Sequence, residues 1–277
     1  NIFNIYFVIK NMENNQDYLN LINVTFSEIN TELIKVVHLL KTDLTQVPSM
    51  ILLNSSCTTW EAISFLTKDY KRFANDVVML SRAVIEKLTN FLYLQVTTED
   101  EKTKFLLHPY YREYHNMNTS KFMWKQKIWF SFSWQNEYKK NDAVKRALDI
   151  FSETNPRLSW SNKNIHEKLT YIDSKVDTSV IFWLFSNLTI YSNASECLHG
   201  SLYWITFLGW IYSPTDENHS VDKNIAKNNA ILLLQISWFM IQVLNFLNKE
   251  YNLKIGNCLE EYQKKLKQSL EHLEKIT

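Results

Sequence analysis

Apolar residues recur every three or four positions along most of this chain, the spacing that places them on one face of a helix. The pattern is clear from about residue 17 to 42, where Ile22, Phe26 and Ile29 share a face. Further helical elements are predicted over residues 58–95, 141–151, 164–173, 178–204, 223–251 and 257–276. Between them we expect a loop with Pro48 and residues 54–57, a break near 68–72, a charged link over 97–104 and a polar loop over 213–222.

The aromatic stretch from residue 108 to 138 gives mixed signals. Residues 129–134 (WFSFSW) alternate like a strand, whereas the flanking residues have helical spacing. Lysines interleave with aromatic residues from Lys121 to Lys140, a composition typical of stacking platforms for single-stranded nucleic acid. A helix packed by its aromatic residues with its lysines in water has the same composition, and the pattern favours this second interpretation.

The composition supports long helices with few tight turns. The chain has 277 residues but only 3 glycines and 4 prolines. A P-loop, a dinucleotide-binding glycine fingerprint and a hydrolase nucleophile elbow all need glycines that this chain lacks. We therefore predict an all-α fold: a single multi-helix, bundle-like domain over residues 15–277, preceded by residues 1–14 as a tail or an upstream extension, with Met12 as a candidate start.

Charge and cysteine content exclude some function classes. With a net charge of +1, the protein as a whole has no electrostatic attraction to nucleic acid. The three cysteines form no CxxC pair, which argues against a disulfide framework and a cysteine zinc site, and we expect a reducing, cytoplasmic setting. Polar residues interrupt the apolar run at 230–247, so it is interpreted as a buried helix and not as a membrane span. In the terminal helix, the lysines balanced by glutamates predict only a solvated face: Lys264, Lys265, Lys267 and Lys275.

The helix around residue 82 carries a polar stripe. At 3.6 residues per turn, one face collects Asn75, Arg82, Glu86, Thr89 and Tyr93. On periodicity alone this is a solvated face with an ion pair worth about 0.2–0.5 kcal/mol. The functional alternative is an interior cleft in which Glu86 directs the guanidinium of Arg82 toward an anionic ligand.

A second polar stripe continues a buried apolar face. The helix predicted from residue 178 begins apolar all round, yet Ser192, Ser195 and His199 follow on the face of Leu188. Buried polar groups need partners, because an unsatisfied one costs about 1–3 kcal/mol. These groups either bond to one another and to the backbone or, with Tyr191 beside them, form a site that includes a histidine titrating near neutral pH.

Four features in order resemble a known family. They are the Arg-x-x-x-Glu helix over residues 80–94 (LSRAVIEKLTNFLYL), Trp160-Ser161 with Ile165, the Tyr-Ser-x-x-Ser element at 191–195, and His199-Gly200-Ser201. Over about residues 60–205 this set is similar to DUF5677, a bacterial family of unknown function. The resemblance implies an all-helical fold and no established reaction. It implies these signature positions: Arg82, Glu86, Trp160, Tyr191, Ser195 and His199.

A more distant similarity is to HEPN-type helical bundles, whose ribonuclease members use an Arg-x4-6-His motif. This chain departs from that motif, because only two residues separate Arg112 from His115 and no other arginine has a histidine at the needed distance. The spacing of His108 and His115, seven residues apart with Arg112 between them, is also unfavourable for binding a metal ion. We therefore predict no metal site and no cofactor.

Three hypotheses follow for function. The leading one is a binding or interaction module that receives an anionic group, with these ligand-binding candidates: Arg82, Trp160, Tyr191, Ser192, Ser195 and Ser201. The second is an RNA-cleaving toxin or phage-defence effector, with His199 as general base, Arg82 stabilising charge on phosphorus and Glu86 as its partner. The third is a scaffold whose signature residues stiffen a polar core. RNA, another anionic ligand or a protein is the expected partner, and the oligomeric state stays open.

Overall fold

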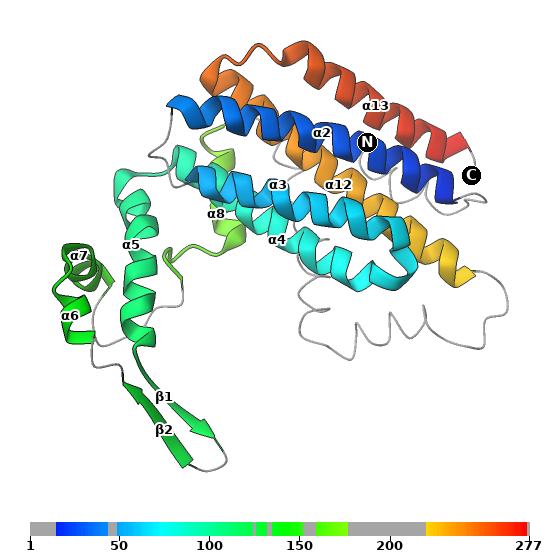
Figure 1. The fold of residues 1–277 in the computed structure, drawn as a ribbon. Helices are drawn as coiled ribbons and strands as arrows, with labels where there is room; N and C mark the ends of the chain where they lie inside the picture. The colour runs from blue at the N-terminus through cyan, green and yellow to red at the C-terminus, as the bar shows by residue number, and fades with distance from the viewer. Residues whose placement is uncertain are drawn as a thin grey trace. The chain divides into compact units, whose positions relative to one another are not determined.

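The computed structural model describes residues 15–43, 49–123, 126–131, 135–151, 159–176 and 220–275 (Figure 1). The chain divides into two compact units, which we call unit 1 (Asn1–Tyr93 with Lys168–Thr277) and unit 2 (Leu94–Glu167). The single domain over residues 15–277 stays a prediction. The expected tail over residues 1–14 lies outside the described residues.

Unit 1 is built from long helices, as the periodicity predicts. Their bounds are α2 Asn15–Asp43, α3 Ser49–Leu66, the 3-10 turn η2 Thr67–Asp69, α4 Tyr70–Val96, α8 Ile165–Asp173, α12 Ser220–Tyr251 and α13 Gly256–Lys275. The last turn of α4 and the first turn of α8 belong to unit 2. The expected break near residues 68–72 is confirmed by η2 and by non-helical backbone at Phe73 (φ −110°, ψ 18°).

The loop expected at residues 54–57 is wrong, because α3 already begins at Ser49. Small polar residues suggested a loop, but here their hydroxyls bond to the carbonyl four residues earlier, which keeps them inside a helix. Ser56 Oγ donates to the carbonyl of Leu52 at 2.7 Å, and Thr59 Oγ1 donates to that of Ser55 at 2.9 Å. These bonds satisfy the hydroxyls locally, so α3 can contain polar residues even where it is buried, as at Ser56.

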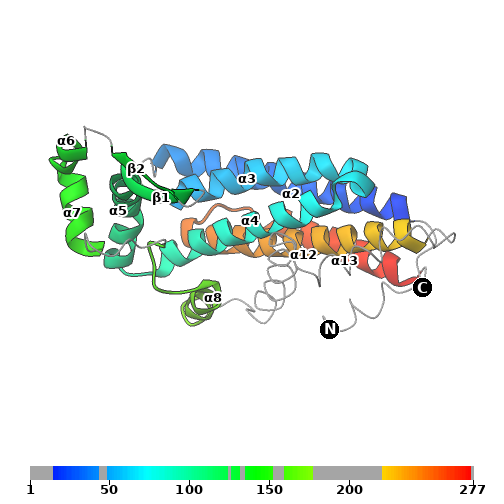
Figure 2. The same ribbon diagram turned by 90° about the horizontal axis from the view of Figure 1, so that it is seen from below.

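The core of unit 1 lies where α2 packs against α3, α12 and α13 (Figures 1 and 2). The rings of Phe26 in α2 and Trp60 in α3 lie 4.0 Å apart between centroids. Helix α4 is tied to α3 by Lys87, whose Nζ donates to Thr59 Oγ1 at 2.7 Å, and burial lowers the pKa of this lysine. Buried aromatic contact and a polar link thus join α2, α3 and α4.

Helix α12 contains the apolar run at residues 230–247, which was considered as a possible membrane span in the sequence. Nearly all of its described residues from Ala230 to Leu247 are buried, including the polar Gln235 and Ser237. No helix in the ranges given above is both long enough and apolar enough to cross a membrane. The interpretation of 230–247 as a buried helix is confirmed.

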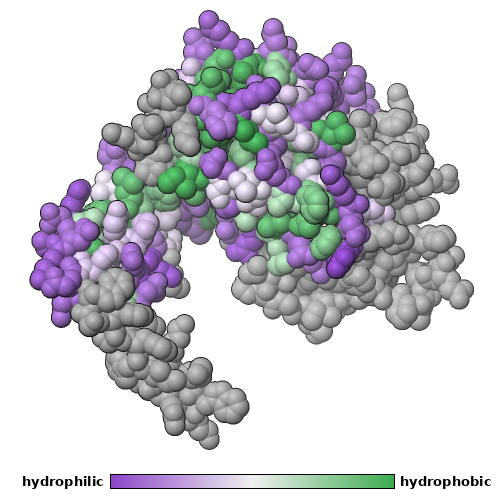
Figure 3. Space-filling model, viewed as in Figure 1, coloured by the Kyte–Doolittle hydropathy of each residue, from purple (hydrophilic) through white to green (hydrophobic). Residues whose placement is uncertain are grey.

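After the end of α4, the described part of unit 2 contains three helices and two strands. They are α5 Glu99–Asn116, the strands β1 Asn118–Met123 and β2 Gln126–Ser131, α6 Gln135–Lys139 and α7 Asp142–Phe151. Its core joins α5 to α7 through Leu107, Tyr111, Tyr114, Val144, Ala147, Leu148 and Phe151. On the face drawn in Figure 3, hydrophilic residues cover most of α6 and α7, in keeping with their exposed lysines and acids.

The charged link expected over residues 97–104 is also wrong, because residues 99–104 form the start of α5. Thr98 is the N-cap, and its hydroxyl accepts from the backbone N–H of Glu101 at 3.5 Å. Three acids occupy the first turn, where the helix dipole favours negative charge. The charges that suggested a solvated linker therefore stabilise a helix start.

The strands β1 and β2 form an antiparallel hairpin, in which Ser120 pairs with Trp129 and Phe122 pairs with Lys127. The strand-like alternation is confirmed in part, since β2 covers residues 126–131. The favoured helix over 121–140 is wrong for the strand residues, because aromatic and β-branched residues there fit a pleated surface. The predicted helical fold is confirmed, with this hairpin as the departure among the described segments. Nucleic-acid stacking by this stretch stays a prediction.

Candidate functional site

The polar stripe on α4 runs from a half-buried ion pair into the core. Arg82 Nε donates to Glu86 Oε1 at 3.1 Å, and the two side chains are 19% and 40% exposed. One and two turns beyond Glu86, Thr89 and Tyr93 are fully buried. The opposite face of α4, with Val84 and Leu88, is buried as well. The stripe is therefore not a solvated face over its whole length.

The Arg82–Glu86 contact fixes a direction for the guanidinium. Glu86 engages the Nε atom, on the side of the group nearest the aliphatic stem, and the terminal Nη1 atom is buried. An Arg-before-Glu pair at this spacing adds only about 0.2–0.5 kcal/mol to a helix. The contact therefore orients the guanidinium more than it stabilises α4.

A second cation meets the same helix from α8. The Lys168 side chain is on a residue only 6% exposed, and its Nζ donates to Asn90 Oδ1 on α4 at 2.7 Å. The same Nζ lies 5.8 Å from the centroid of the Tyr93 ring, and that ring meets Tyr171 edge-on at 5.4 Å. An amide oxygen and an aromatic face thus hold the buried ammonium.

Lys168 and Asn90 are not among the residues predicted from the sequence. A signal was present, because Lys168 falls on the apolar i, i+4 row of its short helix, beside the buried Leu169 and Ile172. A lysine on the inner face of a helix is rare unless its charge has a partner. The partner itself is 78 residues away in sequence, so periodicity could not name it.

Helix α8 starts with a reciprocal cap. Asn164 Oδ1 accepts from the backbone N–H of Glu167 at 3.0 Å, and Glu167 Oε2 accepts from that of Asn164 at 2.7 Å. This capping box satisfies two backbone donors that a helix start leaves without partners. It fixes where α8 begins, with the cap residue Asn164 four residues before Lys168.

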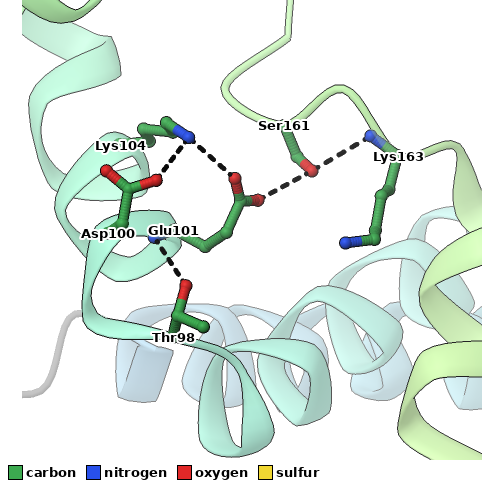
Figure 4. Close-up of polar contacts among 6 residues, drawn as sticks. All are labelled: Thr98, Asp100, Glu101, Lys104, Ser161 and Lys163. Atoms are coloured by element: carbon green, nitrogen blue, oxygen red, sulfur yellow. Dashed lines mark hydrogen bonds and ion pairs between the residues drawn. The ribbon is translucent and has the colours of Figure 1, made fainter.

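Trp160 and Ser161 lie in unit 2, against α5. Ser161 Oγ donates to Glu101 Oε2 at 3.0 Å and accepts from the backbone N–H of Lys163 at 3.2 Å (Figure 4). The other oxygen of Glu101 accepts from Lys104, whose pKa is raised by its hydrogen bonds to Asp100 and Glu101. The Trp160 ring meets Phe105 edge-on at 5.2 Å. These contacts anchor the segment before α8 on α5.

The remaining predicted site residues lie outside the described residues: Tyr191, Ser192, Ser195, His199 and Ser201. The meeting of Arg82 with His199 therefore stays a prediction. His108 and His115 contact aromatic rings, among them Tyr111. Within the part of the chain that the structure describes, no group of three or more His, Cys, Asp or Glu side chains could hold a metal ion.

Comparison with known proteins adds one finding. Residues 46–209 match the sequence profile of a family of unknown function, DUF5677. This range contains the Arg82–Glu86 pair, the Trp160 segment and α8. No significant match is found among curated proteins or among solved structures. These comparisons give no support to the more distant similarity to HEPN-type bundles.

Proposed function

The chain belongs to the DUF5677 family, and we propose that it is a binding module that holds an anionic group at Arg82 of α4. The observation that carries this proposal is the half-buried Arg82 whose Nε is held by Glu86 at 3.1 Å. Residues of the helix predicted from residue 178, including Ser195 and His199, would complete the site.

The physical support comes from the environment of the guanidinium. A group that is 19% exposed interacts with a charge through a lower dielectric than a group in water does, which strengthens the attraction to an anion. The planar guanidinium presents several donors in a fixed fork, which suits phosphate or carboxylate oxygens. Because Glu86 already fixes one donor, less side-chain freedom is lost when an anion binds.

The test uses inorganic phosphate as the probe and thermal unfolding as the readout. We expect phosphate to raise the melting temperature of the wild-type protein above that in chloride at equal ionic strength. Arg82→Ala should lose this rise, because hydrogen bonds to charged groups are worth about 1.5–3 kcal/mol. Glu86→Gln should weaken it, since the neutral amide holds the guanidinium less firmly.

The control is Arg72→Ala, which removes an exposed arginine from the same helix. This variant should keep the phosphate response. A wild-type protein that does not respond, or an Arg82→Ala protein that responds normally, would contradict the proposal. If Arg82→Ala and His199→Ala only lower the melting temperature, the scaffold hypothesis holds instead. If the wild-type protein cleaves a single-stranded RNA and folded His199→Ala does not, the effector hypothesis holds.

A further inference from the structure

We propose that the exposed side of α3 is the interface of a homodimer, in which α3 packs antiparallel against α3 of a second copy of this chain. The twofold axis of this dimer passes beside Thr58, at the middle of the helix. The interface goes beyond the proposed function and is independent of it, because it uses no residue of the anion site at Arg82.

The exposed side of α3, which we call the α3 face, is a straight row of residues. Ile51, Thr58 and Phe65 follow one another at intervals of seven, which is close to two turns of a helix, so they point in nearly the same direction. All three are exposed, and the two apolar residues at the ends are 70% and 69% exposed. Between them lie three more exposed residues: Asn54, Glu61 and Ala62.

Helix α2 lies beside α3 and widens this face (Figure 2). Asn23 of α2 and Ser64 of α3 exchange hydrogen bonds at 3.2 Å and 2.8 Å, which sets the two helices against each other. Val24 therefore lies at the Phe65 end of the face, and Leu39 lies toward the opposite end. Both are 58% exposed. Large apolar side chains thus remain in water at both ends, although their burial would be favourable.

The α3 face also has little charge. Glu61 is the only charged residue of α3, and just after the helix Lys68 Nζ lies 5.7 Å from the centroid of the Phe65 ring. Helices α5 and α13, by contrast, have several acids and lysines on their exposed sides. Depletion of charge is typical of the centre of a protein interface and not of a surface that meets only water.

The symmetry of the α3 face identifies a second copy as the partner. In a twofold contact one patch meets itself, so that residue i contacts residue j and j contacts i. Ile51 and Phe65 lie at equal distances from Thr58 in the sequence. With the axis beside Thr58, each Ile51 therefore meets the Phe65 of the other copy, and the apolar contact forms twice.

The same register leaves no like charges opposite each other on the α3 face. Glu61 and Ser55 lie at equal distances from Thr58, so each Glu61 carboxylate faces the uncharged Ser55 of the other copy. The seven-residue repeat also suits two helices that cross at about 20°, since this angle keeps a heptad row in contact over several turns. Charge and geometry thus both permit α3 to pack on itself.

The area of this side of unit 1 is sufficient for a dimer. About twenty residues of α2 and α3 are at least partly exposed. A stable interface of standard size uses about 20–30 residues on each partner. Because the axis runs across both helices, α2 of one copy comes to lie near α2 of the other and enlarges the contact beyond α3.

The experiment measures the monomer–dimer equilibrium by sedimentation velocity over a series of protein concentrations. We expect the wild-type protein to dimerise reversibly. Ile51→Lys and Phe65→Glu should each raise the dissociation constant at least about tenfold, because each places a charge against an apolar side chain at both ends of the interface. Ile150→Lys makes the same change at an exposed position of α7 and should leave the dimer intact.

The double variant tests the antiparallel register. When Ile51→Lys and Phe65→Glu are combined in one chain, the ammonium of each copy lies opposite the carboxylate of the other, so dimerisation should be restored. In a parallel arrangement like charges would meet, and the double variant would stay monomeric. Since both positions are exposed, we expect circular dichroism and the melting temperature of every variant to match those of the wild-type protein.

A cross-link provides a second measurement at the axis. In Thr58→Cys the two introduced thiols lie next to each other, so mild oxidation should give a disulfide-linked dimer in amounts well above those in the wild-type protein. Glu260→Cys places a thiol at an exposed position of α13 and should not increase the cross-linked fraction. Non-reducing gel electrophoresis reads both results.

Three results would overturn the inference. One is a wild-type protein that stays monomeric at every concentration, with no cross-link in Thr58→Cys. Another is a dimer that neither Ile51→Lys nor Phe65→Glu weakens, since that dimer would use a different surface. The third is a double variant that stays monomeric like the single ones, which would exclude the antiparallel register. None of these results changes the phosphate response of Arg82, so the two proposals fail separately.

Discussion

Burial suppresses the chemistry of the Cys57 thiol on α3. The side chain is buried, and burial together with the Glu61 carboxylate raises its pKa to about 12. At pH 8 the thiol therefore stays almost entirely protonated, whereas the thiolate is the reactive form. We therefore expect iodoacetamide at pH 8 to modify the less buried Cys258 well before Cys57 in the native protein, as measured by peptide mass spectrometry.

The same shift has a sign for stability. In the unfolded chain the Cys57 thiol has an ordinary pKa of about 8.5, and in the folded chain its pKa is higher. The contribution of this difference to the free energy of unfolding is fully present below about pH 8.5. This stability is then lost as the pH rises toward 12. In urea unfolding, the free energy of unfolding of Cys57→Ala should therefore fall less between about pH 8 and 11 than that of the wild-type protein.

For the labelling experiment, equal modification rates of Cys57 and Cys258 by iodoacetamide would show that burial does not control the reactivity of Cys57.

Among the elements, α8 gives the sharpest test because a two-residue cap defines its start. Asn164→Ala removes the side chain that accepts from the N–H of Glu167, so we expect a loss of about 1 kcal/mol in the free energy of unfolding. Urea unfolding measures this loss. Asn162→Ala is the matched control, since this exposed asparagine lies just before the cap and should change stability little. Equal effects of both variants would mean that the box does not hold α8.

The elements also show where sequence reasoning works. Helices α2, α7 and α13 followed from apolar spacing, because one buried face leaves a strong period in the sequence, and α12 followed from its long apolar run. The starts of α3 and α5 were missed since their polar residues bond locally, either to a preceding carbonyl or as a first-turn cap. The hairpin was ambiguous because strand alternation covers only a few aromatic residues. Local polar bonding, not lack of periodicity, is thus the main source of error.

At the scale of the whole molecule, the candidate site was only half predictable. The Arg82–Glu86 pair spans one helical turn, so spacing alone indicated it. The contact of Lys168 with Asn90 joins residues 78 positions apart, and such a pairing depends on how α8 packs on α4. Sequence patterns identify which face of a helix is polar, but they do not identify what meets that face.

The ends of the chain illustrate the same limit, because α13 was interpreted as a solvated face only. In the structure Lys265 Nζ donates to Glu28 Oε2 on α2 at 2.7 Å, across 237 residues, and Leu266 beside it is fully buried. Both ionic groups are more than a third exposed, at 37% and 38%, so solvent screens their attraction. The apolar contact of α13 should therefore outweigh the ion pair.

We expect Leu266→Ala to lower the free energy of unfolding by about 2–5 kcal/mol, since it leaves a cavity in a buried position. Lys265→Ala should lower it by no more than about 1 kcal/mol, and added salt should erase that small effect. Urea unfolding of both variants at low and high salt makes the comparison. A larger loss for Lys265→Ala than for Leu266→Ala would mean that charge, and not apolar burial, joins the two ends of the chain.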